Sequence, residues 1–277
     1  MARIMHLSDL HFGAHDERLV EAVIAEADRL KPDLVVISGD FTQRARTEQF
    51  RQACEFLERL HGRGHEVLAV PGNHDVPLYD LFRRMLWPLA RYRRFIDDSL
   101  CPFAELPGIA VLGINTARSL TFKDGRINKD QVALIRQLFA RTPSDALRIL
   151  VTHHPLFALE VGGELGRAIG RQELALDAVE ESGVEMLLAG HNHHASSEVA
   201  SDLVTRAGGV LVVQAGTATS HRVREQEQSF NTIDIADGIA LITVRVWKGH
   251  QFEPNDARRY ERQDGSWKMG RQAVRAG

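Results

Sequence analysis

The stretch RIMHLSDLHFG, at residues 3–13, is a short apolar run that ends in polar side chains. A helical pattern of apolar residues follows over 16–30, so the sequence predicts a buried strand and then a helix. The same alternation recurs along the N-terminal half of the chain, which is typical of α/β folds. The predicted strands are 33–37, 67–70, 109–114, 148–152 and 184–189, and the predicted helices are 47–60, 78–96, 129–140 and 171–182.

Beyond residue 190 the pattern changes to strands and turns. Apolar runs predict strands at 210–213, 232–235 and 239–246. From Asn255 onward the residues are mostly polar, which predicts a surface-packed or frayed tail. We therefore expect one domain over residues 1–254 and a polar C-terminal tail over 255–277.

The composition is that of an ordinary globular protein that needs no disulfide bonds. The chain has 277 residues, of which 44% are hydrophobic and 26% charged, and it contains two cysteines. A chain of this length buries enough surface to fold without cross-links, and so few cysteines fit a reducing compartment. No apolar run reaches the roughly 18 residues of a membrane span, and the first strand leaves no room for a signal peptide. We expect a cytoplasmic protein, and its net charge of −3 gives no overall attraction to nucleic acid.

Residue types that bind metals stand where the predicted strands end. They follow five separate strands, and the carboxyl ends of strands are where sheets of this class bind ligands. The sequence therefore predicts that side chains far apart along the chain meet in one site. These residues are Asp9 and His11 after the first strand, Asp40 after the second, Asn73, His74 and Asp75 after the third, His153 after 148–152, and His191 and His193 after 184–189.

Carboxylate, imidazole and amide donors together suit borderline divalent ions, such as Mn²⁺, Fe²⁺, Co²⁺ or Zn²⁺. Asp9 and His11 are two residues apart and point the same way along an extended segment, as would a second pair at 191 and 193. Asp40 has two oxygens and can bridge two ions, whereas Asn73 offers a neutral oxygen that limits the negative charge of the site. Two ions about 3.5–4 Å apart would hold a bridging hydroxide and polarise phosphoryl oxygens for in-line attack.

These motifs resemble those of the calcineurin-like metallophosphoesterase superfamily, over residues 3 to 247 and with no ligand position missing. The resemblance implies a four-layer αββα sandwich of two mixed β-sheets. It also implies two divalent metal ions, each held by four residues. By this resemblance the first metal has the ligands Asp9, His11, Asp40 and His193, and the second has Asp40, Asn73, His153 and His191.

The resemblance assigns two further residues to catalysis. His74 would stabilise the transition state or protonate the leaving oxygen, and Asp75 would orient His74. Of the pair His153 and His154, the His-x-Pro pattern of the family selects His153, because Pro155 follows two residues later.

Within the superfamily, the segments SDLHFG (8–13), GDFTQ (39–43) and GTATS (216–220) look like bacterial class III cyclic-nucleotide phosphodiesterases. The implied substrate is a small phosphodiester, foremost a 3',5'-cyclic nucleotide. Gln43 stands where purple acid phosphatases carry an iron-binding tyrosine, and Thr42 stands where repair exonucleases carry an aspartate. The alternatives are a glycerophosphodiester or phospholipid head-group phosphodiesterase, then a nuclease, and finally a metal-free interaction scaffold.

Two features near the predicted site have open roles. His221 and Arg222 follow the loop 216–220 and are candidates for substrate binding by the resemblance. The predicted helix 78–96 carries five arginines. It is either a solvated basic face with Leu86, Leu89, Tyr92 and Phe95 packed inward, or a cleft wall or homodimer contact that attracts anions.

Overall fold

The computed structural model describes residues 1–121, 124–157, 160–161, 164–165, 169–199, 208–221 and 227–270. Its helices form where the sequence pattern predicts an apolar face. Helix α1 (Glu17–Leu30) buries Val20, Val23 and Ile24 on one side, and the side chain of Asp16 caps its first turn by accepting a hydrogen bond from the backbone N–H of Arg18 at 2.9 Å.

The first sheet combines the N-terminal strands with the C-terminal strands. In the described part of the chain it has seven strands in the order β15-β14-β13-β12-β1-β2-β3. Strands β1, β2 and β3 pair in parallel, whereas β12 pairs antiparallel with β1 and β12 to β15 pair antiparallel with one another, so the sheet is mixed. Their bounds are β1 (Ala2–Leu7), β2 (Leu34–Ser38), β3 (Val67–Val70), β12 (Ser229–Ala236), β13 (Ile239–Trp247), β14 (Phe252–Gln263) and β15 (Ser266–Met269).

The second sheet is built from the middle of the chain. It has six described strands in the order β10-β11-β9-β6-β5-β4, with a parallel centre and an antiparallel strand at each edge. A separate antiparallel pair, β7 (Glu160–Val161) and β8 (Glu164–Leu165), lies outside both sheets. The bounds are β4 (Phe103–Leu106), β5 (Ile109–Gly113), β6 (Leu147–Val151), β9 (Met186–Ala189), β10 (Ser196–Val199) and β11 (Leu211–Gln214).

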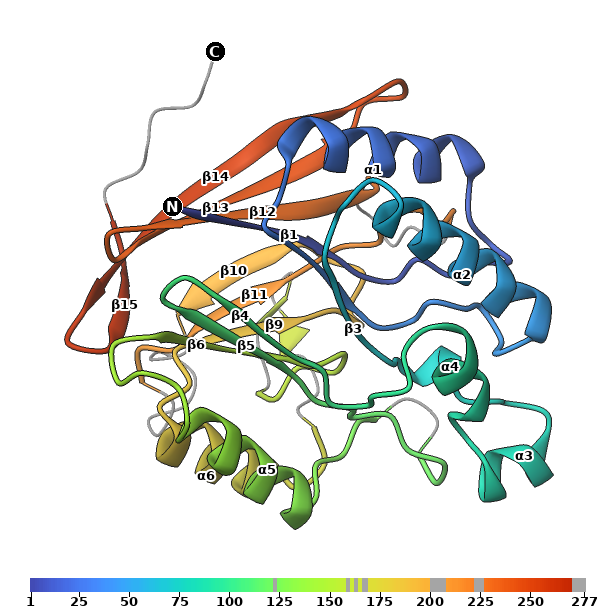
Figure 1. Cartoon of the computed structure of the whole chain (residues 1–277), viewed down its shortest axis with the longest axis horizontal. Helices are drawn as coiled ribbons and strands as arrows, with labels where there is room; N and C mark the ends of the chain where they lie inside the picture. Colours follow the sequence, from blue (N-terminus) through green and yellow to red (C-terminus); the bar gives the residue numbers. More distant parts are fainter. Residues whose placement is uncertain are drawn as a thin grey trace.

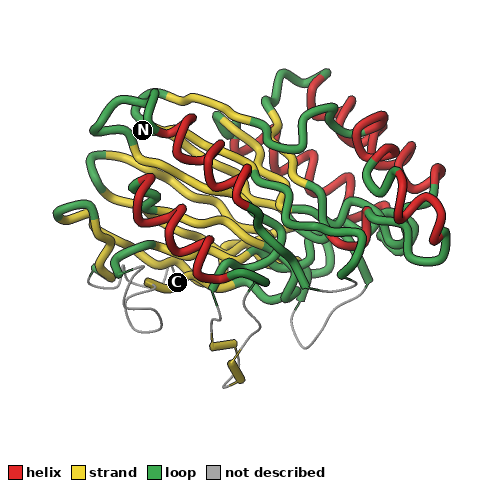
Figure 2. The backbone as a smooth tube through the Cα atoms, turned by 90° about the horizontal axis from the view of Figure 1, so that it is seen from below, coloured by secondary structure: helices red, strands yellow, loops and turns green. Residues whose placement is uncertain are grey.

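The two sheets face each other, and helices cover their outer sides (Figure 1). Helices α1 and α2 (Thr47–His61) cover the first sheet, and α5 (Lys129–Phe139) and α6 (Gln172–Ser182) cover the second. The view from below in Figure 2 shows helices lying in front of the strands. Each boundary between layers has its own apolar cluster, represented by Phe50, Val36 and Ile135. The predicted four-layer αββα sandwich is confirmed.

The predicted polar tail is wrong for residues 255–270, which form most of β14 and all of β15. These strands continue the first sheet at its edge, where only one face of a strand needs to be apolar. Tyr260 and Trp267 supply that face and are fully buried, whereas their neighbours are polar and partly exposed. Two aromatic residues among charged ones give no apolar run, so the sequence pattern concealed both strands. Residues 271–277 lie outside the described part of the chain.

The predicted helix over 78–96 is two short helices, α3 (Leu81–Leu86) and α4 (Ala90–Phe95). The chain breaks at Trp87 because the following residue, Pro88, disfavours helical backbone before it and lacks an N–H donor. The predicted packing is confirmed for Tyr92 and wrong for Leu86, which is 53% exposed.

Helix α3 packs with an arginine inward instead. Arg84 is only 3% exposed, and its guanidinium donates hydrogen bonds to three backbone carbonyl oxygens at 2.6–2.9 Å. A planar group with five N–H donors can satisfy several carbonyls at once. Arg84 therefore joins α3 to two other segments of the chain, and the acceptors are Pro77, Ser119 and Thr121.

Replacing Arg84 with methionine should lower the free energy of unfolding by about 2–4 kcal/mol, because three carbonyl oxygens lose their buried donor. Urea unfolding followed by circular dichroism measures this change. Arg94→Met is the matched control, since Arg94 is exposed on α4 and should change stability by no more than about 0.5 kcal/mol. Equal effects of the two substitutions would refute a structural role for Arg84.

Candidate metal centre

The predicted ligands meet where strands of both sheets end. Backbone hydrogen bonds join the loops: the N–H of Asp9 donates to the carbonyl of Gly39 at 3.1 Å, and the N–H of Gly190 donates to that of His153 at 3.0 Å. The loops after β1 and β2 belong to the first sheet, and those after β6 and β9 to the second. The structure thus brings all seven predicted ligands together across the two sheets.

One group of donor atoms surrounds Asp9. Its Oδ1 lies 3.6 Å from Nε2 of His11 and 3.5 Å from Nε2 of His193, and Nε2 of His11 lies 3.9 Å from Oδ2 of Asp40. Ligands at about 2.0–2.2 Å from one ion lie about 3–3.6 Å from each other. The spacing is therefore that of side chains placed to share one cation.

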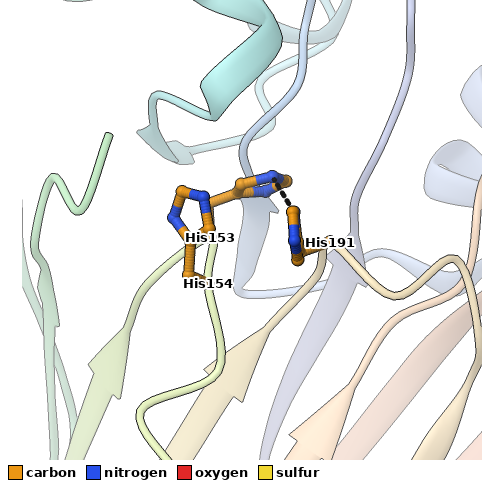
Figure 3. Close-up of side chains that lie close together, drawn as sticks. All are labelled: His153, His154 and His191. Atoms are coloured by element: carbon orange, nitrogen blue, oxygen red, sulfur yellow. Dashed lines mark hydrogen bonds between the residues drawn. The ribbon is translucent and has the colours of Figure 1, made fainter. Parts of the chain in front are cut away.

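A second group surrounds Asn73. Its Oδ1 lies 3.1 Å from both Nε2 of His153 and Nδ1 of His191, and these two nitrogens are 3.3 Å apart (Figure 3). Oδ2 of Asp40 lies 3.4 Å from the same nitrogen of His153. Asp40 is thus the residue that belongs to both groups.

The surroundings of Asp9 fit a cation. This carboxylate is fully buried, and its Oδ2 accepts hydrogen bonds from Oγ of Ser8 at 2.6 Å and from the backbone N–H of His191 at 3.1 Å. Its Oδ1 receives no hydrogen bond from any residue that the structure describes. A buried carboxylate oxygen without a donor is costly unless a cation compensates it. The fully bonded Oδ2 therefore orients Oδ1 as a ligand.

The backbone at the site adopts a conformation that side-chain-bearing residues rarely take. Five of the seven predicted ligands have φ between 50° and 72°, in the left-handed region. Each such residue costs about 1–3 kcal/mol, and this kind of strain clusters at functional sites. The strained loops turn the side chains inward from the strand ends, and the residues are Asp9, His11, Asp40, His191 and His193.

A family model described as calcineurin-like phosphoesterase matches residues 2–195, which contain every predicted ligand. The chain belongs to the calcineurin-like phosphoesterase family.

Two curated proteins and one solved structure resemble this calcineurin-like phosphoesterase. A Synechococcus protein named a probable cyclic nucleotide phosphodiesterase is 25% identical over 176 residues, and the match covers 63% of each chain. The glycerophosphodiester phosphodiesterase GpdQ of Enterobacter lignolyticus is 32% identical over 83 residues, which are 26% of this chain and 29% of GpdQ. Purple acid phosphatase PPD1 from yellow lupin seeds has a TM-score of 0.72 at 13% identity, over 95% of this chain and 54% of that chain. This last likeness is one of fold alone.

Side chains and carbonyls behind the ligands set which ring nitrogen faces the site. Nδ1 of His153 donates to the carbonyl oxygen of Ser38 at 2.7 Å, which leaves Nε2 as the nitrogen that faces the site and can bind a metal. Nδ1 of His193 lies 2.5 Å from Oγ1 of Thr217. Sequence reasoning missed both partners. A backbone carbonyl gives no signal in the sequence, and the only signal for Thr217 was its place in the loop 216–220.

The buried carboxylates and imidazoles shift one another's pKa values. Burial disfavours the cation of His153, but the carboxylates of Asp40 and Asp9 and the hydrogen bond to Ser38 together outweigh burial and raise the pKa of His153 to about 9. Burial and the neighbouring His153 lower the pKa of His191 to about 4. Burial alone would raise the pKa of Asp9 and Asp40, but the surrounding histidines hold the pKa of both carboxyl groups below its usual range. Both carboxylates are therefore charged at neutral pH and suited to bind a cation.

The ring of His74 lies beside the first group of ligands. Its centroid is 4.9 Å from that of His11, and the two rings meet edge to face at 85°. Nδ1 of His74 donates to the backbone carbonyl oxygen of Gln43 at 2.8 Å, so Nε2 is the nitrogen that can exchange a proton with a substrate. The backbone N–H of His74 donates to Oδ1 of Asp40 at 2.8 Å. Two hydrogen bonds, one from the ring and one from the backbone, thus hold His74 next to the centre.

The role predicted for Asp75 needs correction, because the carbonyl of Gln43, not this carboxylate, orients the ring of His74. Asp75 instead ties the loop after β2 to the loop after β3, and it affects His74 only through the backbone. Burial and the nearby Asp40 raise the pKa of Asp75 to about 6. The groups that donate hydrogen bonds to its carboxylate, at 2.8–3.2 Å, are the backbone N–H groups of Phe41, Thr42 and Gly72 and the hydroxyl of Thr42.

The remaining candidates lie at different distances from the centre. His154 also approaches His191, with ring centroids 4.7 Å apart, and Oγ1 of Thr116 lies 2.8 Å from its Nδ1 (Figure 3). His154 is therefore a neighbour of the second group, while His153 is the residue that lies between Asp40 and Asn73. His221 is exposed, and its backbone N–H donates to the carbonyl oxygen of Ala14 at 3.1 Å. Arg222 lies outside the described residues, so its predicted role in substrate binding stays a prediction.

Gly39 gives a steric test of the site. It has φ of +88°, and a Cβ added to it would lie 2.6 Å from Nδ1 of His153. Gly39→Ala should therefore displace this imidazole and remove bound metal and activity together. Gly249→Ala is a matched control, since Gly249 has φ of +87° with no atom within 4 Å of the added Cβ. It should cost about 1–3 kcal/mol of stability and leave the metal content unchanged, as measured by elemental analysis; equal metal loss in both variants would refute the steric account.

Proposed function

We propose that this protein is a dinuclear-metal-dependent phosphodiesterase, and that its substrate is a small phosphodiester, foremost a 3',5'-cyclic nucleotide. The observation that carries the proposal is the shared position of Asp40. Its carboxylate lies within 4 Å of one histidine of the first group and one of the second, so two adjacent ions can be held around it. The proposed ligands are Asp9, His11, Asp40 and His193 for one ion, and Asp40, Asn73, His153 and His191 for the other.

The charge of such a centre suits an anionic substrate. Two divalent ions bring four positive charges, and the two carboxylates, Asp9 and Asp40, cancel only two of them. The other proposed ligands are neutral imidazoles and one amide. The centre therefore keeps a positive charge that attracts a phosphate group. Two bound ions would supply the attacking hydroxide and neutralise charge on the phosphoryl oxygens.

Side chains and loops of the protein would provide proton transfer to the leaving group and positioning of the ligands. His74 lies at the edge of the first group, where its Nε2 can donate a proton to the leaving oxygen while Nδ1 stays bonded to Gln43. Buried loops hold the ligands rigidly before the substrate arrives, which lowers the reorganisation that reaction requires. Mn²⁺, Fe²⁺ and Zn²⁺ all accept this donor set.

The substrate class rests on likeness in sequence. The Synechococcus relative named a probable cyclic nucleotide phosphodiesterase supports a cyclic nucleotide. The likeness to GpdQ, a glycerophosphodiester phosphodiesterase, supports a glycerophosphodiester as the second candidate. Both candidate substrates are small phosphodiesters. They have different leaving groups, and only in the cyclic nucleotide is the phosphate part of a ring.

Hydrolysis by manganese-loaded protein tests the proposal. The substrates are bis(p-nitrophenyl) phosphate, p-nitrophenyl phosphate, cyclic AMP and glycerophosphocholine. We expect turnover of both bis(p-nitrophenyl) phosphate and cyclic AMP at rates well above that of the monoester. Turnover of glycerophosphocholine without cyclic AMP would favour the second candidate. If the protein contains its metal and hydrolyses none of the four substrates, the proposed activity is refuted.

A further inference from the structure

Helix α3 carries an apolar patch that faces solvent. Among the described residues, its large side chains are 53–73% exposed, whereas the helices over the two sheets bury theirs. The inward position of Arg84 leaves the apolar side chains of α3 on the outside. A contiguous surface of this kind marks an interaction site far more often than isolated exposed residues do. We define the α3 patch as Tyr79, Leu81, Phe82, Met85, Leu86 and Trp87.

The surface next to the α3 patch is net positive. Residues 78–98 contain five arginines and three aspartates. Arg84 is buried, and Arg83 and Arg93 pair with Asp80 and Asp98 at 3.0 and 2.9 Å, so Arg91 and Arg94 supply the excess positive charge. Arg83 projects from the same helix and is exposed. Arg91 lines, with Phe82 and Trp87, a hollow of about 280 Å³ on this surface. The surface thus combines aromatic and aliphatic side chains with positive charge.

The α3 patch is continuous with the rim of the metal centre. His74 donates to the carbonyl of Gln43, and the next residue, Arg44, places its guanidinium 5.8 Å from the ring centroid of Tyr79. Only Val76 and Pro77 separate the turn Asn73–Asp75 from the loop that leads into α3. One edge of the molecule therefore carries both the centre and the patch.

We propose that the α3 patch docks on an anionic phospholipid bilayer. The aromatic and aliphatic side chains would enter the boundary between head groups and acyl chains, and the arginines would contact lipid phosphates. Aromatic rings are favoured at this depth because they have both apolar and polar edges. None of the helices in the described residues is long and apolar enough to cross a bilayer. The charge of the rim is what favours an anionic surface as the occupant.

The docked helix is rigid before it meets the lipid. Arg84 bonds α3 to three carbonyl oxygens, and Tyr92 of the following helix is fully buried. Because the segment is already folded, docking loses little conformational entropy. The geometry would hold the metal centre close to the bilayer surface, where diesters of lipid head groups are found.

Vesicle cosedimentation of the full chain tests the docking without depending on turnover. One set of vesicles contains phosphatidylcholine alone, and the other contains phosphatidylcholine mixed with phosphatidylglycerol. The test variant combines Phe82→Ser and Trp87→Ser. The control is Met269→Ser, since Met269 is 61% exposed on β15, far from α3 at the other end of the molecule (Figure 1).

We expect binding to the anionic vesicles, and we expect it to weaken as salt is raised, because salt screens the arginines. The double variant should bind these vesicles roughly tenfold or more weakly, since two apolar side chains no longer leave water. Its circular dichroism spectrum and metal content should match those of the unaltered protein, and Met269→Ser should bind normally.

Three results with vesicles would overturn the proposal. They are no binding to anionic vesicles, equal binding to neutral and anionic vesicles, and full binding by the double variant. The proposal would also be overturned if the unaltered protein self-associates and does not bind vesicles while the double variant is monomeric. A second copy of the chain would then cover the patch. Loss of phosphodiesterase activity in the assay above would leave the binding measurement unaffected.

Discussion

Asp40→Ala should abolish hydrolysis and release bound metal, because a single carboxylate lies beside ligands of both proposed ions. Its Oδ2 lies 3.4 Å from Nε2 of His153 and 3.9 Å from Nε2 of His11, and its Oδ1 accepts a hydrogen bond from the backbone N–H of His74. Even a residue behind a ligand changes metal affinity about 10–100-fold, so loss of a shared ligand should exceed 100-fold at each ion. Elemental analysis after gel filtration and turnover of bis(p-nitrophenyl) phosphate measure the two effects.

Two further substitutions sharpen this test. Asp40→Asn keeps the size of the side chain and removes its charge, so it should retain more structure but still lose most metal. Asp98→Ala removes an exposed carboxylate that pairs with Arg93 and belongs to neither group of ligands, so it should change neither metal content nor rate. A metal-replete and active Asp40→Ala protein would be incompatible with a dinuclear centre built on this residue.

His74→Ala should keep its metal and lose turnover by roughly 10²–10⁴-fold, the usual contribution of a positioned acid or base. The ring lies beside His11 but is bonded through Nδ1 to a backbone carbonyl, so none of the proposed ligands is removed with it. The loss should also depend on the leaving group. A p-nitrophenolate departs without a proton, whereas the alkoxide of a cyclic nucleotide or glycerophosphodiester needs one.

The leaving-group comparison separates proton donation from a structural effect. We expect the variant to lose more activity on cyclic AMP than on bis(p-nitrophenyl) phosphate. His61→Ala, which removes an exposed histidine at the end of α2, should leave both rates unchanged. Equal losses on both substrates would argue for transition-state stabilisation without proton transfer, and loss of metal would show that His74 is itself a ligand.

The order of strands and helices could be predicted from the sequence because the inner strands are continuous apolar runs. Strands β2, β5 and β9 are buried along their whole length, so each stands out as an apolar run between polar segments. The ligand set could be predicted for a related reason. The polar residues of the site come shortly after such runs. Folding alone seldom requires metal-binding residue types at the ends of buried strands, so these residues indicate a site.

The edge strands and α3 could not be predicted in the same way. Strand β14 has a polar sequence because one of its faces meets water, and Phe252 and Tyr260 on β14 with Trp267 on β15 mark the buried side. Helix α3 places Arg84 inside, against the usual preference, because carbonyl oxygens from distant segments need its donors. No local pattern encodes a partner that is 35 residues away.

The sequence by itself determined which residue types stand at the strand ends and how many donors they offer. Those are local properties of short segments, set by burial of the strand and by the polar residues that end it. Only the tertiary structure decided how the donors combine. It places Asp40 between two groups of ligands, each drawn from both sheets, gives His74 the carbonyl of Gln43 as its partner, and turns the apolar side of α3 outward. These outcomes depend on contacts between segments distant in the chain. A hydrogen bond or a shared cation depends on the distance between atoms in space, and not on their separation along the sequence.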